Sequence, residues 1–69
     1  MNVFGVAVRL LRGERMRFLD RHGREWLATA TELHLVRDGI EELIVEGYAA
    51  DIAEEVVRRR APGSRPPSQ

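Results

Sequence analysis

The fold is indicated most clearly by the stretch of residues 37–60, RDGIEELIVEGYAADIAEEVVRRR. Near its start stands the pair Asp38-Gly39, which is typical of a tight type I′ turn between antiparallel strands. Residues 40–46 then predict the returning strand. From residue 48 to residue 60 the apolar residues recur at three- and four-residue spacing, which predicts an amphipathic helix. The stretch therefore predicts a β-hairpin followed by a C-terminal helix.

One face of that predicted helix is apolar and the opposite face is charged. Glu54 and Glu55 stand four residues before Arg58 and Arg59, in the order that stabilises a helix. The apolar stripe consists of Ala49, Ile52, Ala53, Val56 and Val57. We expect this stripe to pack on the sheet.

The preceding segment, residues 24–37, fits two patterns. As a helix it would place Trp26, Leu27 and Leu33 on one stripe. As a strand it alternates well in its second half and leads directly into the Asp-Gly turn, and we prefer the strand. A segment of this length is long for one strand, so we expect a bulge or bend near residues 28–31.

The N-terminal third predicts two further strands and two turns. Apolar residues alternate along residues 2–10, which predicts a strand, and residues 15–19 predict the next one. Residues 11–14 resemble a turn. Residues 20–23 are a hairpin signal, because Asp suits the first turn position and Gly23 suits a left-handed position.

These elements define the expected fold class, α+β. We expect an antiparallel β-meander of three to four strands with one C-terminal amphipathic helix. Residues 1–60 form the single small domain, and residues 61–69, rich in proline, form a flexible tail.

The residue types absent from the sequence exclude several kinds of enzyme chemistry. Among 69 residues there is no cysteine and no lysine, so disulfides, thiolate chemistry and Schiff bases are excluded. His34 and Glu32 stand two apart, which is more typical of a solvated polar pair than of a proton-transfer pair. We therefore expect that the protein is not an enzyme and that it has no catalytic residues, no cofactor and no metal. We also expect no membrane association and a cytoplasmic location in a prokaryote.

Although the net charge is zero, positive and negative charges are segregated along the chain. Residues 1–25 sum to +3, residues 26–57 to −7 and residues 58–69 to +4. We favour the interpretation that these blocks neutralise one another within the fold or across a dimer. The alternative is a basic surface for phosphates beside an acidic surface for a basic partner.

Small size suggests self-association. A domain of about 60 residues buries only about 60% of its unfolded surface, and disulfides are impossible here. We expect a homo-oligomer acting as a non-enzymatic interaction module: a regulator, adaptor or accessory subunit with a possible protein partner. The candidate interface residues are Val3, Val6, Val8 and Trp26. For Trp26 a second interpretation stays open, in which it is the main core residue under the helix.

The alternative function is a nucleic-acid-binding regulator. Its candidate contacts are the arginines of the first hairpins: Arg12, Arg15, Arg17 and Arg24. The zero net charge and the shortage of aromatic residues beside these arginines make nucleic acid the less favoured partner.

Overall fold

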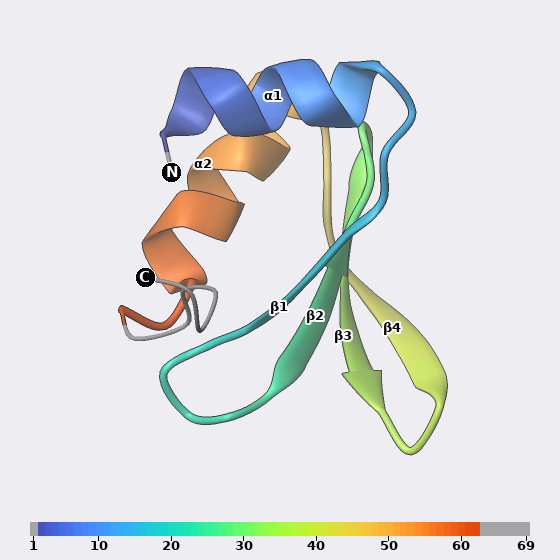
Figure 1. Cartoon of the computed structure of the whole chain (residues 1–69). Helices are drawn as coiled ribbons and strands as arrows, with labels where there is room; N and C mark the ends of the chain where they lie inside the picture. The colour runs from blue at the N-terminus through green and yellow to red at the C-terminus, as the bar shows by residue number, and fades with distance from the viewer. Residues whose placement is uncertain (1, 63–69) are drawn as a thin grey trace.

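The computed structural model describes residues 2–62, which form one four-stranded antiparallel sheet and two helices (Figure 1). The elements in chain order are α1 (Val3–Leu11), β1 (Met16–Leu19), β2 (Glu25–Ala28), β3 (Glu32–Arg37), β4 (Ile40–Glu46) and α2 (Ala49–Arg59). The strands follow one another in the sheet as β1-β2-β3-β4, which is a meander. The predicted α+β class is confirmed.

Both helices lie on the same side of the sheet and pack against each other, while the β3–β4 hairpin extends away from them (Figure 1). The core lies between the helices and this face. Its buried members are Val6, Leu10, Met16, Phe18, Trp26, Ala28, Leu33, Leu35, Ile52, Ala53 and Val56. Phe18 and Trp26 stack at its centre, with ring centroids 6.4 Å apart.

The predicted strand over residues 2–10 is wrong, because this segment forms α1. Asn2 caps the helix, since its Oδ1 accepts a 2.7 Å hydrogen bond from the backbone N–H of Gly5. Val6 and Leu10, one helical turn apart, are buried, whereas Phe4 is 79% exposed. The same apolar residues fit a period of 3.6 as well as a period of 2, and the N-cap favours the helix.

The turn expected over residues 11–14 is present, but it ends a helix instead of joining two strands. The N–H of Gly13 donates to the carbonyl of Leu10 (3.0 Å), and the N–H of Glu14 donates to that of Arg9 (3.1 Å). This pair of bonds is a Schellman motif, which needs a left-handed residue at its centre. Gly13 supplies it with φ +93°.

The preference for strand over helix in residues 24–37 is confirmed, and the chain departs from a straight strand within the expected range, residues 28–31. The single long strand is wrong, because the segment forms two strands, β2 and β3. The chain reverses between β2 and β3, where the N–H of Thr29 donates to the carbonyl of Glu32 (2.9 Å). The Thr29 Oγ1 in turn accepts from the N–H of Glu32 (3.1 Å). The reversal changes which residues share a face of the sheet. Leu33 now lies on the core side with Trp26, and Leu27 faces the opposite side.

Most of the remaining predictions for the sheet and the last helix are confirmed, but of the two glutamate–arginine pairs expected in the helix only Glu55–Arg59 forms, because Arg58 also pairs with Glu55. Gly23 closes the turn at 20–23 with φ +78°, and Asp38-Gly39 takes two positive φ angles, +52° and +77°. The predicted strand over 40–46 matches β4. In α2 the predicted apolar stripe is buried except at Val57, which is half-buried.

The end of α2 is tied to β1. The N–H of Ala61 donates a 3.0 Å bond to the carbonyl of Leu19, and Asp20 forms an isolated bridge with Arg60. Of the tail predicted over residues 61–69, residues 63–69 lie outside the described part of the chain. The described domain therefore ends on the edge of the sheet at β1.

Candidate functional site

The structure separates the four predicted interface residues. Val6 and Trp26 are buried in the protomer's own core, where neither can reach a partner. Val3 and Val8 are half-buried on α1. Of the two interpretations of Trp26, the structure therefore supports the second, in which Trp26 is a core residue packed under α2.

An exposed apolar surface nevertheless exists on α1, on its side away from the core. Phe4 is 79% exposed and Leu11 is 70% exposed, and the half-buried Val8 lies between them. Their spacing of four and three residues places them on one stripe. We call these three residues the outer face of α1.

The outer face could have been found from the sequence only with the helix already known. Seven of the nine residues of α1 are apolar, and Arg9 is its one charged residue. A helix that is apolar around most of its circumference is typically covered on more than one side. In a strand, Phe4 and Val6 would lie on the same face, whereas in a helix they lie on opposite faces.

The two edges of the sheet differ. The edge at β1 is occupied at Leu19 and Asp20 by the chain after α2. The edge at β4 has no neighbouring strand within residues 2–62. It exposes three large apolar residues and three glutamates: Ile40, Leu43, Ile44, Glu41, Glu42 and Glu46. A register shift opposite Leu33 and His34 also interrupts its pairing with β3.

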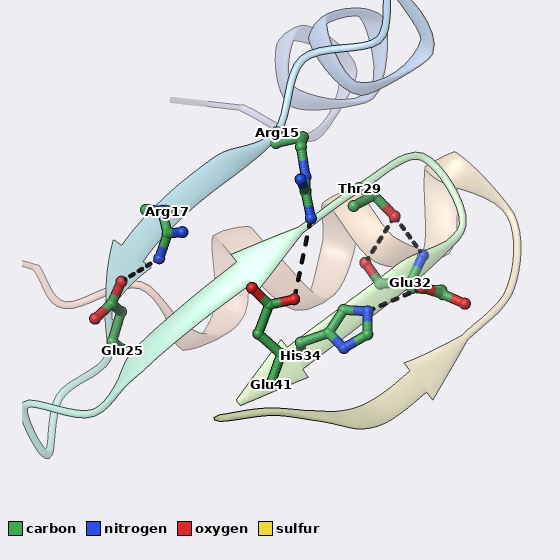
Figure 2. A network of polar contacts seen from close by, with 7 residues as sticks. All are labelled: Arg15, Arg17, Glu25, Thr29, Glu32, His34 and Glu41. Atoms are coloured by element: carbon green, nitrogen blue, oxygen red, sulfur yellow. Dashed lines mark hydrogen bonds and ion pairs between the residues drawn. The ribbon is translucent and has the colours of Figure 1, made fainter. Parts of the chain in front are cut away.

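The arginines proposed for nucleic acid are dispersed and paired. Figure 2 shows Arg15 and Arg17 on the sheet face opposite the helices, each directed to a glutamate. The ion pairs are Arg12–Glu14 (3.8 Å), Arg15–Glu41 (4.0 Å), Arg17–Glu25 (2.6 Å) and Arg24–Asp20 (2.9 Å). Only Arg24 lies beside further arginines, at the turn between β1 and β2. The four do not form one surface.

His34 and Glu32 are paired on the same polar face (Figure 2), with 2.9 Å between Nε2 and Oε1. The other ring nitrogen of His34, Nδ1, is buried and has no hydrogen-bond partner within residues 2–62. A catalytic histidine is oriented by a third group at that nitrogen. The pair lacks this third group.

Residues 2–62 contain no group of three histidine or acidic side chains placed to hold a metal ion. Neither helix within this range is long and apolar enough to cross a membrane.

Asp20 is buried and accepts four hydrogen bonds. Its Oδ1 accepts the backbone N–H groups of His22 (2.8 Å) and Arg24 (3.0 Å), and its Oδ2 accepts Arg24 Nε (2.9 Å) and Trp26 Nε1 (2.8 Å). Burial by itself would raise the pKa of this carboxyl. The hydrogen bonds from Trp26, Arg24 and His22 outweigh burial and hold the pKa well below its ordinary value.

No protein-family model matches the chain, and no similar protein was found among curated proteins or among solved structures.

Proposed function

We propose that this protein is a small non-enzymatic interaction module that self-associates through the outer face of α1. The observation that carries the proposal is the exposure of Phe4 (79%) and Leu11 (70%) on a helix that has a single charged residue. Keeping side chains of this size in water is unfavourable in free energy. An exposed apolar stripe of this kind is typical of an interaction surface.

A second copy of the chain fits this surface. In an antiparallel two-fold arrangement, Phe4 of one copy would meet Leu11 of the partner subunit, and the reverse contact would repeat it. The two Val8 side chains would lie near the crossing point. Glu14 pairs with Arg9 at 2.8 Å and with Arg12 at 3.8 Å, so it offsets part of the positive charge beside this face. The outer face itself holds no carboxylate or guanidinium that would have to lose its water.

The free energy of association that we expect is that of a reversible dimer. Burying one Phe or Leu side chain fully gains about 1.5–3 kcal/mol. Two copies of Phe4 and Leu11 therefore gain about 6–12 kcal/mol, against an association cost of roughly 4–15 kcal/mol. We expect a dissociation constant in the micromolar range or weaker.

The edge at β4 is the competing surface for self-association, and its charges disfavour it. Three of its seven residues are glutamates, and two copies would bring these like charges together. Charged residues and a register shift on an edge strand are devices that prevent edge-to-edge pairing. Because the outer face of α1 carries neither device, it is the better site.

Size-exclusion chromatography with light scattering tests the proposal across a concentration series from about 10 µM to about 1 mM. We expect the mass to rise with concentration from 7.9 kDa toward twice that value. Leu11→Glu should keep the mass at that of the monomer. Ile40→Glu is the matched control, because Ile40 is also 70% exposed but lies on β4. Circular dichroism confirms that both variants fold.

Two results would contradict the proposal. The first is a mass of 7.9 kDa at every concentration. The second is a dimer that survives Leu11→Glu and is lost in Ile40→Glu, which would move the contact to the edge of β4.

A further inference from the structure

A basic hollow lies where the turn between β1 and β2 meets the C-terminal end of α2, two segments that Figure 1 shows close together. It has a volume of about 330 Å³ and is open to solvent. It is lined by Asp20, Arg21, His22, Arg24, Arg58 and Arg59. The fold thus brings the first and the last basic blocks of the sequence to one place.

The two carboxylates at the hollow do not neutralise its four guanidinium groups. Arg58 and Arg59 share a single oxygen, Oε1 of Glu55. Asp20 is bonded to Arg24, and all four of its close donors come from its own hairpin. Within residues 2–62, Arg21 takes part in no ion pair. The four arginines that line the hollow, set against Asp20 and the neighbouring Glu55, leave a surplus of two positive charges.

Arg59, which lines the hollow, is held by contacts on two sides. The guanidinium of Arg59 lies 4.7 Å from the ring centroid of Trp26, and the indole N–H of Trp26 is bonded to Asp20. Glu55 holds Arg59 from the other side, with 2.8 Å between Nε and Oε1. These contacts fix Arg59 before any ligand arrives, which lowers the entropic cost of binding. Arg21 and Arg58 are exposed and can turn toward a ligand.

We propose that this hollow binds a phosphate group, either free inorganic phosphate or the phosphate of a small monoester. A phosphate dianion carries the charge that the surplus requires, and its oxygens accept paired hydrogen bonds from guanidinium groups. The open side of the hollow leaves room for the remainder of a monoester. This site is separate from the outer face of α1 and does not depend on self-association.

The chain contains a probe for this site, because Trp26 is its only tryptophan. A phosphate dianion bound to Arg59, whose guanidinium lies over the Trp26 ring, changes the electrostatic environment of the indole. The experiment titrates the protein with inorganic phosphate, and separately with glycerol 3-phosphate, at constant ionic strength in a buffer free of phosphate. We expect a saturable change in Trp26 fluorescence with one or both ligands. Tighter binding of glycerol 3-phosphate would identify a monoester as the preferred source.

Arg58→Ala and Arg21→Ala test the assignment, because both side chains are exposed and their removal leaves the Asp20–Trp26 contact in place. Each should weaken phosphate binding about tenfold, the effect of losing a hydrogen bond to a charged group. Arg37→Ala is the matched control. The Arg37 side chain is 68% exposed and paired with a glutamate, as the Arg58 side chain is, but it lies on the β3–β4 hairpin. Binding to this control should equal binding to the unaltered protein.

A second measurement covers binding that leaves the fluorescence unchanged. In ¹⁵N-labelled protein, phosphate should move the amide signals of residues 20–24 and 56–60 and leave those of β4 in place. Three outcomes overturn the proposal: no saturable change by either method at millimolar phosphate, equal weakening by Arg37→Ala and Arg58→Ala, or the same response to chloride. Binding of a single-stranded oligonucleotide where both small phosphates fail would also overturn it, in favour of a nucleic-acid ligand.

Discussion

The indole Nε1–H of Trp26 donates a 2.8 Å hydrogen bond to Oδ2 of Asp20, and both side chains are buried. This bond joins the turn between β1 and β2 to the centre of the core, because Trp26 also stacks on Phe18. The same carboxylate closes its own turn through the N–H groups of His22 and Arg24. One side chain therefore couples the local turn to the tertiary packing.

Asp20→Asn should destabilise the protein by about 3 kcal/mol. Each carboxylate oxygen of Asp20 accepts two hydrogen bonds. In the Asn variant an NH₂ group, which cannot accept them, replaces one of these oxygens, so the N–H groups that donated to it lose their acceptor. Urea denaturation followed by circular dichroism measures the loss. Asp38→Asn is the control. Asp38 has φ +52° in an exposed turn, where Asn is equally suited, so its change should stay within about 0.5 kcal/mol. Equal effects at the two positions would contradict the role assigned to Asp20.

Acid should destabilise the fold through Asp20 and Glu55. Burial by itself raises the pKa of each carboxyl, but the hydrogen bonds from Trp26 and Arg24 to Asp20, and from Arg59 and Arg58 to Glu55, hold both pKa values below their ordinary values of 3.8 and 4.5. The unfolded chain then binds protons more readily than the folded chain. Their contribution is complete above the ordinary values and is lost as the pH falls through the lowered ones.

Urea unfolding at intervals from about pH 6 to about pH 2 measures this dependence. The free energy of unfolding should fall with pH below about 4.5. Glu55→Gln should make that fall shallower, because one of the two titrating carboxyls is gone. A free energy of unfolding that stays constant or rises on acidification would show that these carboxylates do not stabilise the fold.

Two glycine-to-alanine changes should have opposite signs. At Gly13 the φ of +93° strains any other residue, so Gly13→Ala should cost about 1–2 kcal/mol. At Gly47 the added Cβ would meet Asp51 at an ordinary distance of 3.8 Å, and φ lies outside the left-handed region. Gly47→Ala should therefore be neutral or stabilise by up to about 1 kcal/mol. Melting temperatures of the two variants check this, and a loss of stability at Gly47 would contradict it.

Ile52→Ala should cost about 2–5 kcal/mol, because Ile52 is fully buried between α2 and the rest of the core and its truncation leaves a cavity. Glu54→Ala on the opposite side of the same helix removes only an exposed side chain, and should cost well under 1 kcal/mol. The comparison uses urea midpoints of both variants. Similar midpoints would mean that α2 contributes little to the core.

Secondary structure was predictable where local chemistry admits one conformation. Asp38-Gly39 and Gly23 need positive φ angles, so the turns they form are the same in any surrounding fold. The helix α2 was predictable because its apolar spacing fits only a period of 3.6. For α1 the spacing fits two periods, and the local signals that decide it, the Asn2 cap and the left-handed Gly13, lie at its ends.

Local sequence patterns were sufficient to predict the fold class, the two glycine turns and the burial of one side of α2. Which residues share a surface depends on the tertiary structure. The reversal at Thr29 moves Leu27 to the face opposite Leu33, and α1 turns Phe4 outward. Likewise, the basic hollow joins Arg21 to Arg58, which are 37 positions apart in the sequence, because Arg60 is bridged to Asp20. Periodicity describes one element at a time, whereas a surface depends on the register between elements, and packing sets that register.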